Sequence, residues 1–384
     1  MWQSQFTWFF SLFQHEFRKD NPVAFEVLMV LALAHFFGLY NPKQLADFLD
    51  VSHQSFYTYL KTWSLYHLRA MLLRFMVKQA AEELAAVLGK SAATRSRAGL
   101  SLSIDNSVID RLGKLLRCTW SWYSGRCKKV VQGQDLLGIV LTIHHVALPL
   151  HLLFCSKQGR SNTDKPAQLI AMLAQLKDEF NRYDIEITQI PLTLDSWFVS
   201  EPLRQQLYEL GFSKIIIAGK GNYTFTIRHH KQKASAWKKD LTWHPPTWGI
   251  EVPSCRVWAH NPTFGSVILL FFQKSTTRSY YLMNFSQHAM RGAEIWHIWK
   301  QHHQIECFWK MLKSVFQIRA MRLHDNGLYA ALLIKVLAYL LAIRLRVNKA
   351  FSKCSITQLM RRVRREEDLR DLIDEHFHGT YLTM

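Results

Sequence analysis

Between residues 100 and 218, strand-like segments alternate with helical ones, and this order constrains the fold more than any other feature. Alternating or continuous apolar runs predict strands at 100–104, 136–146, 148–155, 190–194 and 214–218. Two helical patterns lie among them, at 164–180 and 200–210. Strands that are separated by helices commonly pair in parallel, so the order predicts a mixed α/β sheet with a parallel portion.

Different patterns flank this segment. Residues 1–95 have helical periodicity throughout and predict an all-helical N-terminal domain, followed by the first part of an α/β core at 96–218. Residues 219–290 are rich in Trp, His, Pro and β-forming residues, which predicts a β-rich insertion. The second part of the core is expected at 291–347, and a basic helical tail at 348–384.

Residues 43–63 have the pattern of a helix-turn-helix. Asn41-Pro42 opens a short helix, Asp50 tolerates the left-handed backbone of a tight turn, and Ser52 is suited to cap a second helix. In DNA-binding proteins this motif places its second helix in the major groove. An ordinary helical hairpin is the alternative.

The chain carries a large excess of positive charge. Its 384 residues include 48 Lys and Arg against 29 Asp and Glu, a formal net charge of +19. Nucleic acid is the commonest partner for such a protein, and an anionic membrane surface is the second possibility. Arg228, Lys231 and Lys233 belong to a basic segment that we interpret as a contact to the DNA backbone, with a solvated loop as the alternative.

Two apolar runs resemble membrane spans. Residues 23–40 contain Glu26 and His35, and residues 329–347 contain Lys335 and two arginines, so both are expected to be buried helices and no membrane is expected as a partner. The six cysteines are scattered without a Cys-x-x-Cys pair, which is typical of a reducing compartment. The N-terminus lacks the basic region of a signal peptide. We therefore expect a cytoplasmic location.

Three carboxylates form the candidate site. Asp105 and Asp195 each follow a predicted strand, and parallel neighbours would place both at one edge of the sheet. Glu306 lies in a helix predicted at 296–313. Carboxylate oxygens suit Mg²⁺ or Mn²⁺, and two such ions can activate a water or a 3′-hydroxyl and stabilise the leaving oxygen of a phosphodiester. A single Asp after a strand is more often a turn residue, so the prediction rests on the combination.

The helix predicted at 296–313 has two unlike faces. At about 100° per residue, one narrow stripe carries Glu306 together with aromatic and basic side chains, and large apolar residues form the opposite face. The basic residues beyond Glu306 would face the scissile phosphate. An amphipathic surface helix with paired charges is the alternative. The stripe consists of Trp299, His302, Glu306, Lys310 and Lys313.

Three sequence blocks resemble those of DDE transposases of the IS4 type. They are Ser103-Ile-Asp105-Asn-Ser107, Thr193-Leu-Asp195-Ser-Trp197-Phe198 and Trp299-x2-His302-x3-Glu306-x6-Lys313. The similarity covers about residues 95–345 and includes an insertion before the helix that carries Glu306. It implies a catalytic core of RNase H-like fold in which Asp105, Asp195 and Glu306 are catalytic and bind the metal.

The resemblance also implies an activity and partners. A transposase of an insertion sequence cuts the ends of its element and joins the freed 3′-hydroxyl to target DNA. Its partners would be double-stranded DNA, at terminal inverted repeats and at the target, and a second copy of the chain in a synaptic complex. Such a protein would work at a bacterial or archaeal nucleoid. An RNase H-like endonuclease without strand transfer and a catalytically inactive DNA-binding derivative are the alternatives.

The third block departs from the family pattern. The family has Tyr seven residues and Arg four residues before the Glu, where this chain has Trp299 and His302. Trp is able to stack on a base or sugar, whereas a neutral His holds phosphate more weakly than Arg. Some relatives hold a flipped base with an aromatic residue of the insertion. The candidates, each more often a core residue, are Trp237, Trp243, Trp248 and Trp258.

Overall fold

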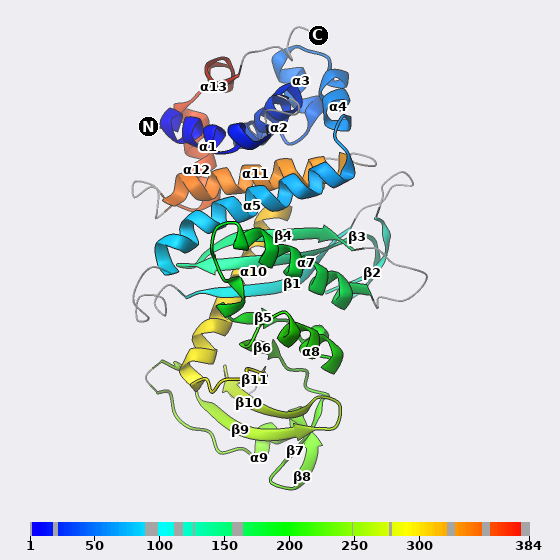
Figure 1. Cartoon of the computed structure of the whole chain (residues 1–384), viewed down its shortest axis with the longest axis vertical. Coiled ribbons are helices and arrows are strands. Elements are labelled where there is room, and N and C mark those ends of the chain that lie inside the picture. The colour runs from blue at the N-terminus through cyan, green and yellow to red at the C-terminus, as the bar shows by residue number, and fades with distance from the viewer. Residues whose placement is uncertain are drawn as a thin grey trace. The chain divides into compact units, whose positions relative to one another are not determined.

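A computed structural model describes residues 2–17, 22–88, 99–110, 118–125, 127–155, 164–247, 249–275, 279–320, 327–347 and 354–377. The chain divides into two compact units, whose elements are labelled in Figure 1. The first comprises Met1–Phe75, Val108–Asp135 and Phe308–Met384, and the second comprises Met76–Ser107 and Leu136–Cys307. The domain boundaries inferred from the sequence stay a prediction.

A mixed sheet of 11 strands confirms the predicted mixed α/β class. The strand order is β2-β3-β1-β5-β6-β11-β10-β9-β7-β8, and β4 pairs with β3. β5 pairs in parallel with both β1 and β6, which supplies the expected parallel portion. The strands are β1 (Ser101–Asp110), β2 (Trp120–Ser124), β3 (Lys129–Ile143), β4 (Val146–Phe154), β5 (Leu192–Leu194), β6 (Ile215–Ala218), β7 (Thr224–Ile227), β8 (His230–Lys233), β9 (Ser254–Asn261), β10 (Gly265–Gln273) and β11 (Ser279–Asn284).

β1 extends further than the sequence predicts. It continues through Asp105 to Asp110, because Ser107 and Ile109 keep the alternation of buried positions beyond the polar pair at 105–106. The first candidate carboxylate therefore lies within a strand and not at its end. The strands of the segment predicted to be β-rich, at 219–290, also join the same sheet, since β11 pairs antiparallel with β6 through Met283 and Ile217.

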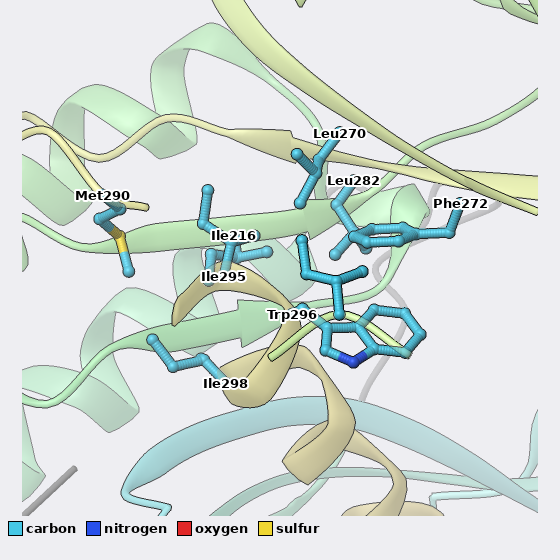
Figure 2. Packing of buried hydrophobic residues seen from close by; sticks show 9 residues of the cluster. Ile216, Leu270, Phe272, Leu282, Met290, Ile295, Trp296 and Ile298 are labelled. Atoms are coloured by element: carbon cyan, nitrogen blue, oxygen red, sulfur yellow. The ribbon is translucent and has the colours of Figure 1, made fainter. Parts of the chain in front are cut away.

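Buried apolar side chains hold the start of α10 (Gly292–Ser314) against the second unit's sheet (Figure 2). Trp296 lies beside Phe272, with ring centroids 4.4 Å apart. Ile295 is fully buried against Ile216 of β6 and Leu282 of β11 within the same cluster. Burying one such side chain contributes roughly 1.5–3 kcal/mol, so this cluster fixes the first turns of α10 on the sheet.

Two longer helices and several short elements complete the second unit. α7 (Asp164–Asn181) and α8 (Glu201–Glu209) lie close to the predicted ranges. Ser200 begins α8 as its N-cap, because its side chain accepts a hydrogen bond from the backbone N–H of Leu203. The short elements are η2 (Ile187–Gln189), η3 (Ser196–Phe198) and α9 (Ala234–Asp240).

The first unit is mainly helical. α11 crosses it as a buried helix, as predicted from its apolar run. Its helices are α1 (Trp2–Phe17), α2 (Pro22–Ala34), η1 (His35–Phe37), α3 (Pro42–Leu49), α4 (His53–Lys61), the start of α5 (Leu65–Leu88), the end of α10, α11 (Gly327–Val347), α12 (Ile356–Glu366) and α13 (Leu369–His376).

By length and composition alone, one described helix would be able to cross a membrane. It is α11, and 94% of its apolar window is buried inside the structure. Residues 23–37 and 42–49 pass the same test only as a pair bent by 84°. The core helix of a soluble protein passes this test too, so the finding is weak support for a membrane span.

His35 and Lys335, one polar residue from each of the two apolar runs, meet inside the first unit. Lys335 is fully buried, and its Nζ lies 2.6 Å from His35 Nε2 and donates a hydrogen bond to the Tyr40 carbonyl at 2.7 Å. His35 Nδ1 lies 2.6 Å from the Leu31 carbonyl. Burial, and next the Lys335 charge, lower the pKa of His35 well below its ordinary value. His35 is therefore neutral, and its Nε2 accepts from the ammonium.

The segment 43–63 forms two helices joined by a tight turn. Asn41 caps α3 by accepting from Gln44 N, and Asp50 has a φ of 59° in the turn. The Ser52 hydroxyl accepts from Gln54 N at 3.3 Å and begins α4. Each local expectation for this turn matches the observed backbone, while its role in DNA recognition stays a prediction. The side chains that α4 exposes are His53, Gln54, Thr58 and Lys61.

Candidate active site

The register of β1 and β5 brings Asp105 and Asp195 to neighbouring positions. Ile104 pairs with Leu194, so the two aspartates are the next residues along the two parallel strands. Such strands lie about 4.8 Å apart. Both side chains are half-buried. Asp105 Oδ1 accepts from the backbone N–H of Asn106 at 2.7 Å, and Asp195 Oδ1 accepts from that of Ser196 at 2.6 Å.

His302 connects α10 to the end of β5. Its Nδ1 is hydrogen-bonded to Thr193 Oγ1 at 2.9 Å, and the same hydroxyl lies 3.0 Å from Ser103 Oγ on β1. Trp299 stacks on the His302 ring at 4.5 Å, with an angle of 9° between the planes. These contacts attach α10 to β5 at Thr193, two residues before Asp195. The sequence did not single out Thr193 and Ser103 for this role, although both belong to the quoted blocks.

The helical position of His302 predicted an outward-facing side chain. The structure shows instead that the side chain is buried, with only 6% exposed. Burial lowers the pKa of His302 to about 4, although the charges of Glu306 and Asp195 act to raise it. The ring is therefore neutral near pH 7 and is bonded to the protein. The phosphate contact expected of His302 stays a prediction, and its bond to Thr193 gives it a role in positioning α10.

Glu306 lies one helical turn beyond His302 and faces solvent. Its side chain is 61% exposed, and its Oε2 lies 2.9 Å from Nδ1 of His303. The charge of Glu306, like that of Asp195, acts to raise the pKa of His302 against the larger effect of burial. Within the described ranges, no group of three or more His, Cys, Asp or Glu residues is placed to hold a metal ion. In this structure Glu306 is paired with His303.

The two candidate lysines lie on the part of α10 that belongs to the first unit. Lys310 is exposed. Lys313 Nζ donates a hydrogen bond to the carbonyl of Val108 at 2.8 Å, which ties the end of α10 to the end of β1. Near this contact, Arg319 pairs with Asp110 at 3.3 Å, so Asp110 at the end of β1 is part of an ion pair.

The basic residues of the insertion gather on one hairpin. Lys231 and Lys233 alternate along β8 and share a face, opposite Thr226 and Thr224 of β7. Arg228 lies at the tip of this hairpin, in the two-residue turn Arg228-His229. Both turn residues have positive φ, at 48° and 71°, a conformation that favours Gly or Asn.

One of the candidate tryptophans is exposed. Trp258 on β9 is 70% exposed, and the alternation of the strand places Arg256 and His260 on the same face. Trp237 is buried and donates to the Phe225 carbonyl, while Trp243 donates to the Lys238 carbonyl. Trp248 lies outside the described residues. The alternation of buried and exposed positions along β9 is the signal that would have distinguished Trp258.

Tyr223 lies close to the carboxylates and has no counterpart in the sequence prediction. Its hydroxyl donates to the Ser196 carbonyl at 3.1 Å. Burial, and next the charge of Asp195, raise the pKa of Tyr223. Lys165 of α7 lies over the Trp197 ring at 4.8 Å and is buried. These two side chains support the segment that begins at Asp195.

Comparisons with known proteins give a family and a similar structure. The model of the transposase DDE domain family matches residues 119–341, more than half of the 384 residues. The match includes Asp195 and Glu306 and begins after Asp105. No curated protein matches the sequence. Among solved structures, a piggyBac transposase in a synaptic complex with hairpin DNA is 13% identical, over 97% of this chain and 81% of that chain, with a TM-score of 0.49.

Proposed function

The chain belongs to the DDE transposase family, and we propose that Asp105, Asp195 and Glu306 are the carboxylates with which it cleaves and joins DNA. The family makes it a DNA transposase, and the resemblance to this family is thereby confirmed; the match includes the second and third blocks. The parallel register of β1 and β5 carries the assignment of residues. It sets the two aspartates side by side, and His302 holds α10 on β5 one turn before Glu306.

We extend the proposal to the fold of the core and the origin of the protein. The order β4-β3-β1-β5-β6, with a parallel β1-β5-β6 portion and an antiparallel β3–β4 hairpin, supports an RNase H-like core. Strands β7 to β11 follow β6 before α10 begins, which supports the insertion proposed at 219–290. We propose that the chain is the transposase of an insertion sequence and acts in the cytoplasm of a bacterium or archaeon.

Divalent metal use is a property of DDE transposases, and the donor set here fits Mg²⁺ or Mn²⁺. Three carboxylates supply only hard oxygen donors, and two of them start from adjacent strands. When bound, two such ions would activate the attacking hydroxyl and stabilise the leaving oxygen. Glu306 must leave His303 to join the aspartates, and its 61% exposed side chain has room to turn.

The other side chains position the helix and the DNA. Neutral His302 holds α10 at β5 without a charge of its own. Exposed Lys310 offers a counter-charge for the scissile phosphate, and Lys313 fixes the end of the helix on β1. Arg228 and the lysines of β8 would contact the backbone of double-stranded DNA at the terminal repeats or at the target. Synapsis of two ends calls for a homodimer.

The decisive experiment is cleavage and joining of labelled duplex DNA that carries the sequences flanking the gene. The intact protein is compared with Glu306→Gln and with His303→Gln, a neighbouring exposed residue, in Mg²⁺ or Mn²⁺. We expect Glu306→Gln to abolish both products while DNA binding persists, and His303→Gln to keep activity.

Each alternative has its own outcome. Cleavage without joined product would identify an endonuclease of the same fold. DNA binding without cleavage by any of the proteins would identify an inactive derivative. Full activity of Glu306→Gln would show that the site is assigned to the wrong residues.

A further inference from the structure

α12 in the first unit has two opposed faces. Its apolar side chains are buried on one face, and its polar side chains lie on the opposite face. This exposed face carries an arginine stripe, which consists of Arg361, Arg362 and Arg365. The buried face consists of Ile356, Leu359, Met360 and Val363.

The arginine stripe lines an open groove of about 530 Å³. The groove contains one carboxylate, Glu366, which pairs with Arg362 at 2.6 Å. Three guanidinium groups against one carboxylate leave the groove with an excess of two positive charges. Among the described residues that line the groove there is no large apolar side chain, the feature that protein partners use as an anchor. The remaining residues of the lining are Cys354 and Gln358.

Other arginines dock this segment on the N-terminal helices. Arg364 donates from Nε to the carbonyl of Phe36. Arg370 of α13 donates to the carbonyl of Phe48 at 2.7 Å and lies over the Phe48 ring at 5.3 Å. Phe48 belongs to α3, two residues before the turn at Asp50. The C-terminal helices are thus packed beside the helix-turn-helix segment, and Arg364 and Arg370 contribute to this docking.

We propose that the arginine stripe, which lies on a helix packed beside the helix-turn-helix segment, binds the phosphate backbone of duplex DNA. The inference rests on the proposed function only in that the chain must bind duplex DNA. Arg361 and Arg365 are separated by about 6 Å along the helix axis, which spans about two phosphates of one strand at 3.4 Å each. Guanidinium groups recognise phosphate by two parallel hydrogen bonds, and an apolar anchor is not required.

The test is the salt dependence of binding of the full chain to a fluorescein-labelled 20-base-pair duplex of arbitrary sequence. Each lost phosphate contact lowers the slope of log K against log salt by about 0.9. The triple substitution Arg361→Gln, Arg362→Gln, Arg365→Gln is therefore expected to reduce the slope by about 2.7. Arg182→Gln in the second unit, whose side chain is 58% exposed, removes one positive charge, as each single substitution of the stripe does, and should leave the slope unchanged.

The outcomes separate the inference from the proposed function. If the intact chain binds no duplex, both fail. If it binds and the triple variant has the same slope, only the arginine stripe is refuted. If thermal unfolding shows that the triple variant is not folded, Arg361→Gln and Arg365→Gln are measured singly, and each must lower the slope by about 0.9. Binding of polyglutamate through the stripe, with an unchanged DNA slope, would identify an acidic protein partner and overturn the inference.

Discussion

Acidification is expected to destabilise the fold through His302. The ring is 6% exposed and is hydrogen-bonded to Thr193, and burial lowers its pKa from 6.5 to about 4. In the unfolded chain the same residue titrates near its ordinary value. As the pH falls below 6.5, the unfolded state therefore takes up a proton that the folded state excludes, and stability is lost until the pH reaches about 4.

The size of the effect follows from the same shift. One pKa unit corresponds to about 1.4 kcal/mol, so the full loss across this window is about 3.4 kcal/mol. Between pH 7 and pH 5 the loss amounts to about 2 kcal/mol. His302 is almost fully buried, so solvent screening takes little from this value. The numbers refer to the free energy of unfolding and not to catalytic activity.

Urea unfolding at pH 7 and pH 5 measures the effect, with His302→Gln as the variant that cannot titrate. We expect the intact protein to lose about 2 kcal/mol more than His302→Gln between the two pH values. Taking this difference removes the contribution of His35, whose pKa is also lowered. His303→Gln is the matched control, because this neighbour is 67% exposed and should behave like the intact protein. Equal losses in the intact protein and His302→Gln would refute the reasoning.

Three further predictions concern other parts of the structure. Lys335→Ala should cost about 2–5 kcal/mol in urea unfolding, because it leaves a cavity and also leaves His35 and the Tyr40 carbonyl without their partner, and Lys335→Met, which fills the space, should cost less; equal costs would contradict this. Arg228→Asn with His229→Gly should raise the melting temperature by relieving two positive φ angles and should weaken duplex binding; unchanged affinity would remove the hairpin from the DNA contact. Trp258→Ala should change stability by less than about 0.5 kcal/mol. If Trp258 stacks on a base, Trp258→Ala should weaken binding to duplexes with one unpaired base by about 1–3 kcal/mol, measured against fully paired duplex.

The sequence predicted the parts of this protein that depend on local periodicity and capping. α7, α10 and α11 lie close to their expected ranges, because each has a long helical pattern of apolar residues. The turn at Asp50 was equally local, since its left-handed backbone and the cap at Ser52 involve only neighbouring residues. The aspartates were selected because each follows an apolar strand, the glutamate because it lies on the stripe of a long helix, and the resemblance of their blocks to a known family supported the choice.

Only the tertiary structure decided how these parts meet. The register of β1 with β5 and the antiparallel pairing of β11 with β6 join residues that are far apart in the chain. The same is true of the burial of His302, which its position on the helix assigned to the outward stripe and which the hydroxyl of Thr193 turns inward. Helical and strand periods specify which face of an element is apolar, but they do not specify the partner of that face. The partner then determines whether a single polar residue faces solvent or the core.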